Sequence, residues 1–164
     1  MQVSCGVNHV SFWKIKGSTL KRQKGLYGKT KNICTAVTIG SIHQGGSGDY
    51  HIVTGMANGR LYKWNQHKLD TKNGILKAHT KKVTALWSYS DGLISGSSDG
   101  TIVMWDTQLQ QLRTVDVKPL CWTLSDPTIG GAVASEDAPD TPVRRSNNAA
   151  IQSVTIKDGK ILVG

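Results

Sequence analysis

Three residues in one short stretch of the chain, His79, Ser95 and Asp99, have the side chains that build a serine hydrolase triad. In such a triad the imidazole takes the proton of the serine hydroxyl, and the carboxylate orients the ring. Ser95, however, lies in the strand-like run LISG and lacks the G-x-S-x-G elbow that exposes a nucleophilic serine. The sequence therefore argues against catalysis, and we expect a protein that is not an enzyme and needs no cofactor.

The same residues have a structural interpretation once Trp105 is included. An aspartate in a turn accepts hydrogen bonds from backbone N–H groups and from an imidazole, and a serine hydroxyl joins the imidazole to an indole N–H. A buried indole donor needs such a partner. We therefore predict a structural hydrogen-bond relay that consists of His79, Ser95, Asp99 and Trp105.

A partial relay is expected earlier in the chain, where Thr54, Asn58 and Trp64 stand in place of the serine, the aspartate and the tryptophan. No histidine lies at the corresponding distance before Asn58, so this second relay is incomplete.

The relay residues belong to a repeated pattern, in which a glycine and a short turn are followed by alternating apolar residues and a tryptophan. Trp13, Trp64 and Trp105 end the three copies, and their spacings are 51 and 41 residues. A four-stranded β-propeller blade repeats every ~40–45 residues. The longer first spacing is explained by the Gly-rich stretch GSIHQGGSGD at 40–49. The copies read SCGVNHVSFWK (4–14), TGMANGRLYKWN (54–65) and SGSSDGTIVMWD (95–106).

Short β-strands are the expected secondary structure, because runs rich in β-branched and aromatic residues alternate with turn signals. The pairs Asn58-Gly59, Asp91-Gly92 and Asp99-Gly100 suit tight hairpin turns. The predicted class is all-β: a propeller fragment with about two full four-stranded blades and two partial blades. The clearest strand-like runs are 33–39, 50–55, 60–64, 83–87, 93–96 and 101–105.

The repeat divides the chain into five expected segments. These are the C-terminal strands of a blade with a basic loop, two successive blades, a Pro-containing insertion loop, and the first strands of a further blade. The insertion holds all 4 prolines, which suit loops better than ladder strands. Both ends cut through a blade, so we expect a piece of a longer protein. The boundaries are 1–26, 30–78, 79–117, 118–148 and 149–164.

Positive charge is concentrated at the start of the chain. The formal net charge is +9, and the first acidic residue is Asp49. Such asymmetry indicates a negatively charged partner: an acidic protein surface, nucleic acid or anionic lipid. The alternative is that the basic segment is a solvated loop without a partner. Nucleic acid is the less favoured partner, because the tryptophans are already assigned to blades. The basic residues before Asp49 are Lys14, Lys16, Lys21, Arg22, Lys24, Lys29 and Lys31.

Other candidate sites are weaker. The stretch GLYGKT at 25–30 lacks the first glycine of a phosphate-binding loop and precedes a strand-like run. Three cysteines lie far apart without a C-x-x-C pair, which favours reduced thiols and disfavours a structural zinc site. The histidines share no metal spacing, and no apolar run is long enough to span a membrane. Thr141, which precedes a proline, is a possible phosphorylation site.

The stretch that ends in Trp105-Asp106 resembles the WD-repeat family of β-propellers. The order of distinct blades is also similar to the echinoderm microtubule-associated protein-like family. The similarity is carried by VSCGVNHVSFWKIKGSTLKRQKGLYGK, IVTGMANGRLYKW, DGLISGSSDGTIVMWD and DGKILVG. The resemblance implies a WD-repeat scaffold that binds microtubules or tubulin in the cytoplasm. The alternative is a general protein-interaction scaffold with another partner. The family's N-terminal coiled coil and its hydrophobic motif are absent from these residues.

Overall fold

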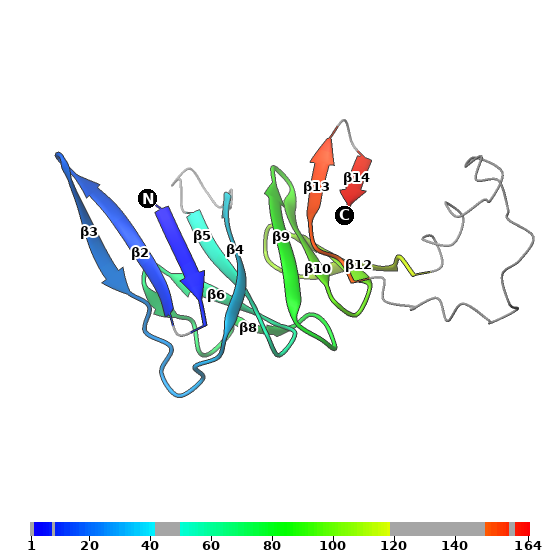
Figure 1. Ribbon diagram of the computed structural model, residues 1–164, viewed down its shortest axis with the longest axis horizontal. Coiled ribbons are helices and arrows are strands. Elements are labelled where there is room, and N and C mark those ends of the chain that lie inside the picture. The colour runs from blue at the N-terminus through cyan, green and yellow to red at the C-terminus, as the bar shows by residue number, and fades with distance from the viewer. Residues whose placement is uncertain (1, 8, 42–49, 119–149, 158–159) are drawn as a thin grey trace, which may run out of the picture.

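The computed structural model describes residues 2–7, 9–41, 50–118, 150–157 and 160–164. These residues form β-strands and no helix, which confirms the predicted all-β class. The strands make four antiparallel sheets that follow one another in chain order, from left to right in Figure 1. Most of the Pro-containing segment 118–148, including Thr141, lies outside the described residues.

The first sheet has the order β1-β2-β3, with β1 at Gln2–Gly6, β2 at His9–Lys16 and β3 at Thr19–Lys24. The sequence analysis expected a basic loop where β3 lies. β3 was missed because its residues TLKRQK are almost entirely exposed and, apart from Leu20, polar, so they carry no apolar alternation.

The second sheet runs β4-β5-β6-β7, and β8 pairs with the first residues of β6, whereas β7 pairs with the last ones. Its central strand β5 is buried on both sides, so its apolar residues are nearly continuous and do not alternate with polar ones. The strands are β4 (Cys34–Ser41), β5 (Tyr50–Met56), β6 (Arg60–Asn65), β7 (Lys68–Leu69) and β8 (Ile75–Lys77).

The third sheet is a four-stranded meander, and the fourth is a hairpin. The third has the order β12-β11-β10-β9, in which β10 is buried along its whole length. Strands β9 (Val83–Tyr89), β10 (Gly92–Ser97), β11 (Thr101–Asp106) and β12 (Gln111–Asp116) make the third sheet, and β13 (Val154–Lys157) and β14 (Lys160–Val163) make the fourth.

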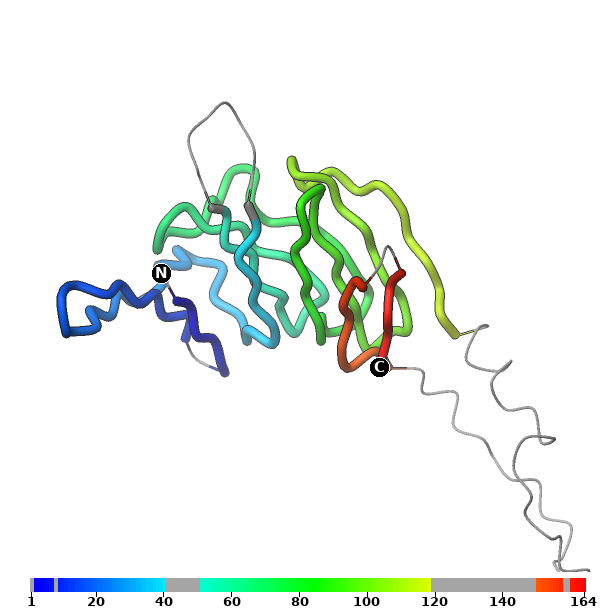
Figure 2. The backbone as a smooth tube through the Cα atoms, turned by 90° about the horizontal axis from the view of Figure 1, so that it is seen from above, coloured from blue at the N-terminus to red at the C-terminus, as the bar shows by residue number. Residues whose placement is uncertain are grey.

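Three apolar clusters form the core, one at each junction between neighbouring sheets. The first joins Phe12 of β2 to Trp64 of β6, whose rings are 5.5 Å apart. The second packs Val53 and Leu61 against Trp105, and the third packs the third sheet against the fourth. The sheets therefore bury their faces against each other like the blades of a propeller, a layering that Figure 2 shows from above.

A threonine hydroxyl crosses two of these junctions in the same way. Thr35 of β4 donates to the carbonyl oxygen of Gly55 in its own sheet and to that of Val83 in the next. Thr84 of β9 repeats the arrangement, with carbonyl acceptors on Gly96 and Ile151. The repeat seen in the sequence is thus also a repeat of the contacts between sheets.

Candidate functional site

The third sheet contains a continuous hydrogen-bond chain. The indole Nε1 of Trp105 donates to Ser95 Oγ (3.0 Å), which lies 2.8 Å from His79 Nε2. The other ring nitrogen of His79 lies 2.8 Å from the hydroxyl of Thr101, and that hydroxyl donates to Asp99 Oδ1 (2.6 Å). Five residues therefore make up the chain.

Thr101 is the member that the sequence analysis missed. Asp99 Oδ1 is 3.8 Å from His79 Nδ1, too far for a hydrogen bond, so the threonine hydroxyl bridges the two. One assignment of hydrogens satisfies every link: each group donates to the next, from the indole to the carboxylate. This assignment makes His79 neutral, with its proton on Nδ1.

Each carboxylate oxygen of Asp99 accepts two hydrogen bonds. Thr80 donates through its backbone N–H and its hydroxyl to Oδ2, both at 2.8 Å, and Thr101 donates in the same two ways to Oδ1. Burial alone would raise the pKa of Asp99, but together the hydrogen bonds from Thr101 and Thr80 hold that pKa below its ordinary value. Burial lowers the pKa of His79, against the opposing charge of Asp99. Asp99 is therefore ionised and His79 neutral near pH 7.

The position of His79 is set by the turn of the preceding sheet. Its backbone N–H donates to the carbonyl oxygen of Gly59 (2.9 Å), the glycine of the β5–β6 turn. Gly59 has a φ of 78°, and a Cβ there would collide with the His79 carbonyl. The Asn58-Gly59 pair therefore fixes both a hairpin and the start of the next relay.

The relay is closed to solvent. Ser95 is 0% exposed and His79 is 5% exposed. Because the Ser95 hydroxyl and both ring nitrogens already have partners, a substrate finds no free group there. We interpret the residues as structural, a tether that holds β10 and β11 to the loop before β9.

The second sheet has a shorter version of the relay. Trp64 Nε1 donates to Thr54 Oγ1 at 2.9 Å, deep in the core. Asn58 is exposed, and its side-chain oxygen accepts from the backbone N–H of Arg60 at 3.3 Å. The structure therefore brings Thr54 and Trp64 together and leaves Asn58 apart from them.

The first sheet holds a similar bond that the sequence analysis did not find. Trp13 Nε1 donates to Ser4 Oγ at 3.0 Å. Ser4 thus takes the place of Thr54 and Ser95 in the later sheets. The sequence did not reveal this match, because the turn in the first copy is shorter than in the second, which changes the spacing between the hydroxyl residue and the tryptophan.

The basic residues do not form one patch. Five lie on the β2–β3 hairpin, whereas Lys29 and Lys31 are exposed in the loop before β4. Figure 1 shows the tip of the hairpin and this loop at opposite ends of the first sheet. The hairpin residues are Lys14, Lys16, Lys21, Arg22 and Lys24.

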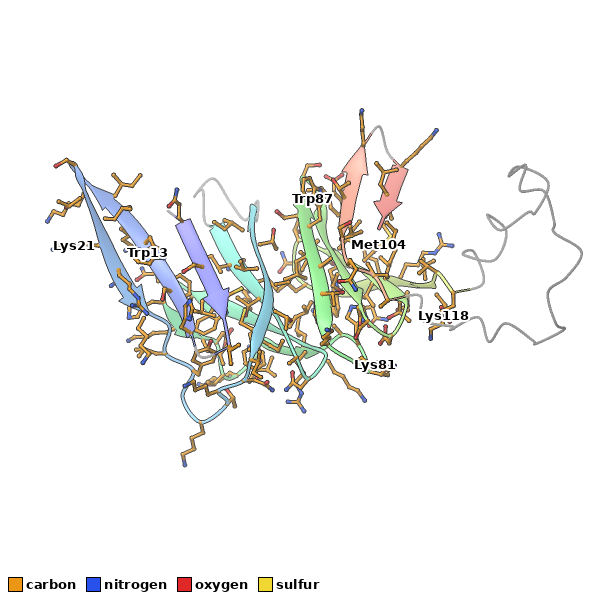
Figure 3. The ribbon with its side chains drawn as sticks, viewed as in Figure 1. Trp13, Lys21, Lys81, Trp87, Met104 and Lys118 are labelled. Carbon is orange, nitrogen blue, oxygen red and sulfur yellow. The ribbon has the colours of Figure 1, made fainter. Side chains whose placement is uncertain are left out.

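The outer half of the hairpin extends beyond the rest of its sheet. The last pair between β1 and β2 is Gln2 with Trp13, so the residues after Trp13 pair with β3 alone. Figure 3 shows Lys21 on this projecting part, far from Lys118 at the other end of the molecule.

One face of the outer half of the hairpin carries three lysines, and its remaining residue is Thr19. Lys14 and Lys21 are directly opposite each other in the register, and Lys16 shares their face because it is two residues from Lys14. Like charges placed directly opposite each other in a sheet are destabilising. None of these lysines forms an ion pair with a carboxylate of the described residues, so their repulsion is not relieved within this part of the chain.

The other face is apolar and basic. Ile15 and Leu20 are opposite each other, and both are more than half exposed. Arg22 is fixed there: its Nε donates to Ser11 Oγ at 3.0 Å, and its guanidinium lies 5.9 Å from the centre of the Trp13 ring. Arg22 therefore supports the hairpin, while the lysines of the opposite face are free to meet a partner.

Other kinds of site find no support in the described part of the chain. These residues contain no group of three or more His, Cys, Asp or Glu that could hold a metal ion. They also contain no helix that is long and apolar enough to cross a membrane.

Comparison with known proteins defines the class. The WD domain, G-beta repeat family matches residues 70–106, which include His79 and end with Trp105-Asp106. The crystal structure of the computationally designed Ika4 protein has a TM-score of 0.55, with 18% identity, over 99% of this chain and 77% of that one; this likeness concerns the fold alone. The matched repeat and the sheets described above make the chain part of a WD-repeat β-propeller.

Curated relatives are more specific. The chain is 30% identical to human echinoderm microtubule-associated protein-like 2 over 117 residues, which are 70% of this chain and 17% of the relative. It is 26% identical to human echinoderm microtubule-associated protein-like 4 over 170 residues, 96% of this chain and 16% of that protein. The 77 kDa echinoderm microtubule-associated protein of Lytechinus variegatus is 27% identical over 117 residues, 70% of this chain and 17% of its own length.

These matches bear out the resemblance seen in the sequence. The chain is a WD-repeat protein whose relatives are echinoderm microtubule-associated protein-like proteins, and it spans about 17% of the length of the first of them.

Proposed function

We propose that this chain is part of a cytoskeletal scaffold and binds microtubules through the β2–β3 hairpin. The observation that carries the proposal is the basic face of Lys14, Lys16 and Lys21, in which two lysines oppose each other with no carboxylate of the described residues to neutralise them. An acidic protein surface removes this repulsion when it binds. The names of the curated relatives point to microtubules as that surface.

The proposed mechanism is electrostatic, with an apolar contribution. Exposed lysines steer an acidic surface toward the hairpin, and their effect is screened by salt. Ile15 and Leu20, on the opposite face, offer apolar area that a partner enclosing the tip would bury. The first core cluster holds the sheet that carries the hairpin against the second sheet, and the relay, which lies in the third sheet, takes no direct part in binding.

A charge-reversal experiment tests the proposal. The triple variant Lys14→Glu, Lys16→Glu and Lys21→Glu is compared with the original chain in microtubule cosedimentation over a series of salt concentrations. If each lysine contributes about 0.5 kcal/mol, the loss is at least ~1.4 kcal/mol, which corresponds to about tenfold weaker binding. Binding by the original chain should also weaken as salt rises.

A matched control separates the hairpin from net charge. Lys72, Lys118 and Lys160 are exposed and lie outside the first sheet, so reversing these three changes the net charge by the same amount. The control should bind like the original chain. Equal loss in both variants would show that only net charge matters. Binding to nucleic acid or to another acidic protein in place of microtubules would refute the choice of partner.

A further inference from the structure

The junctions between sheets follow one rule. In the second and third sheets, the residue that accepts the tryptophan hydrogen bond is followed by a glycine, Gly55 or Gly96. A Cβ built on Gly55 would lie 2.7 Å from the Cβ of Val83, and one built on Gly96 would lie 3.5 Å from that of Ile151. Gly55 therefore faces Val83, the first residue of β9, and Gly96 faces Ile151, which lies just before β13, both at close range.

The first junction has cysteines at both of these positions. Cys5 follows Ser4, as the glycines follow their hydroxyl residues. Cys34 precedes Thr35, just as Val83 precedes the equivalent threonine in the third sheet. Both cysteines belong to the core cluster between the first two sheets. Two thiols thus occupy the place where the other junctions bring two residues into contact.

The two neighbouring thiols differ in burial and in pKa. Cys34 is buried and Cys5 is half-buried. The neighbouring Cys34 thiol lowers the pKa of Cys5 to about 7, against the effect of burial, while the same interaction and burial raise the pKa of Cys34. The Cys34 thiol also lies 3.4 Å from the carbonyl oxygen of Ala36. Cys5 is therefore the thiol that ionises and that solvent reaches first.

We propose that Cys5 and Cys34 form an oxidisable dithiol, which hydroperoxides convert to an intrachain disulfide between the first and second sheets. The Cβ separations built at the equivalent Gly55 and Gly96 junctions are 2.7 and 3.5 Å, so this position brings two residues at least as close together as the about 3.5–4.5 Å that a disulfide requires. The proposal does not depend on which partner the hairpin binds.

The chemistry has two steps. The Cys5 thiolate attacks one oxygen of the hydroperoxide, so that an S–O bond forms, the O–O bond breaks, and the second oxygen leaves with a proton as water or an alcohol. The Cys34 sulfur then attacks the Cys5 sulfur, the S–S bond forms, and the S–O bond breaks. The proton of Cys34 leaves with the hydroxide as water. The two sulfurs lose two electrons, which the peroxide gains.

The bond would enclose the whole basic segment. All seven basic residues that precede Asp49 lie between Cys5 and Cys34, so the disulfide makes the hairpin and the following loop part of a closed ring. Oxidation would then fix the hairpin to the second sheet even when the apolar contacts of the first junction open.

The test uses the full chain, which has 3 cysteines. Protein treated with hydrogen peroxide is alkylated, digested without reduction and mapped by mass spectrometry, and thermal unfolding is recorded before and after. We expect a monomer with a Cys5–Cys34 linked peptide, two thiols lost to alkylation, and a higher Tm that dithiothreitol reverses. The Cys121→Ser variant should behave in the same way.

Single variants identify the roles. Cys34→Ser should stop the reaction at a Cys5 sulfenic acid that dimedone traps, and Cys5→Ser should leave Cys34 reduced at the same peroxide concentration. The proposal is overturned if peroxide leaves both thiols free, if Cys5 is driven to sulfinic acid in the original chain without a link, or if the links formed join Cys121 or two separate chains. Each of these outcomes can be read from the original chain alone, so it does not depend on the folding of a variant.

Discussion

Removing the carboxylate of Asp99 is the most direct test of the relay. In Asp99→Ala, four hydrogen bonds lose their acceptor, two from Thr80 and two from Thr101. Thr80 is exposed, so water replaces the carboxylate for that residue. Thr101 is half-buried, and its hydroxyl can turn toward His79, but its backbone N–H is left without a partner.

The size of the effect follows from this count. One buried donor left unsatisfied costs about 1–3 kcal/mol, with more when the lost acceptor is charged. We therefore expect Asp99→Ala to lower the free energy of unfolding by about 2–3 kcal/mol, which lowers Tm by roughly 4–12 °C for a chain of this size. Asp99→Asn keeps one carbonyl acceptor and should lose about half as much.

Urea unfolding followed by tryptophan fluorescence measures the loss. Asp116→Ala is the matched control, since Asp116 is an exposed aspartate whose side chain, among the described residues, accepts only the backbone N–H of Lys118, and it should change stability by less than ~0.5 kcal/mol. If Asp99→Ala and Asp116→Ala unfold at the same urea concentration, the carboxylate does not hold the relay together, and the reasoning is refuted.

Two further predictions concern pH and the turn before the relay. Because burial lowers the pKa of His79, the unfolded chain takes up a proton more readily than the folded one, so stability should fall as pH drops below the ordinary histidine value of 6.5. Asp99 adds a further loss at lower pH, below the ordinary carboxylate value. Urea midpoints at pH 5 and pH 8 should therefore differ, and by less in His79→Gln; a flat profile in the original chain would contradict this. Gly59→Ala should destabilise by at least ~2 kcal/mol, because its φ of 78° and its contact with the His79 carbonyl both exclude a Cβ. Gly17→Ala is the control, with a φ of 61° and open space around it, and its thermal unfolding should reveal only the backbone strain of ~1 kcal/mol.

The strands that the sequence predicted are those with a buried face. Runs such as TIVMW and RLYKW combine β-branched or aromatic residues with flanking turn pairs, and they became β11 and β6. β3 and β12 were missed because they are outer strands, whose residues are mostly exposed and therefore show no apolar pattern. Residue type therefore predicts a strand only where one face of the strand is buried, because burial requires apolar side chains on that face.

The residues around the relay show a similar limit. Ser95 and Trp105 stood out because Thr54 and Trp64 occupy the same positions relative to an earlier turn, and His79 stood out because an imidazole can link Ser95 to Asp99. Thr101 gave no such signal, because a threonine is ordinary in a strand and its hydroxyl matters only once Asp99 is known to be too far from the ring. The contact between Cys5 and Cys34 was hidden for another reason: it exists only when two sheets pack, and spacing along the chain does not report that.

The threonine hydroxyls at the junctions have a mechanical consequence. Thr35 and Thr84 each donate one hydrogen toward two carbonyl oxygens, one in their own sheet and one in the next. A sheet that unfolds therefore deprives its neighbour of a hydrogen bond between the sheets as well as of apolar contacts. Loss of order should spread from sheet to sheet along the chain, as nearest-neighbour coupling does in a linear array of repeats.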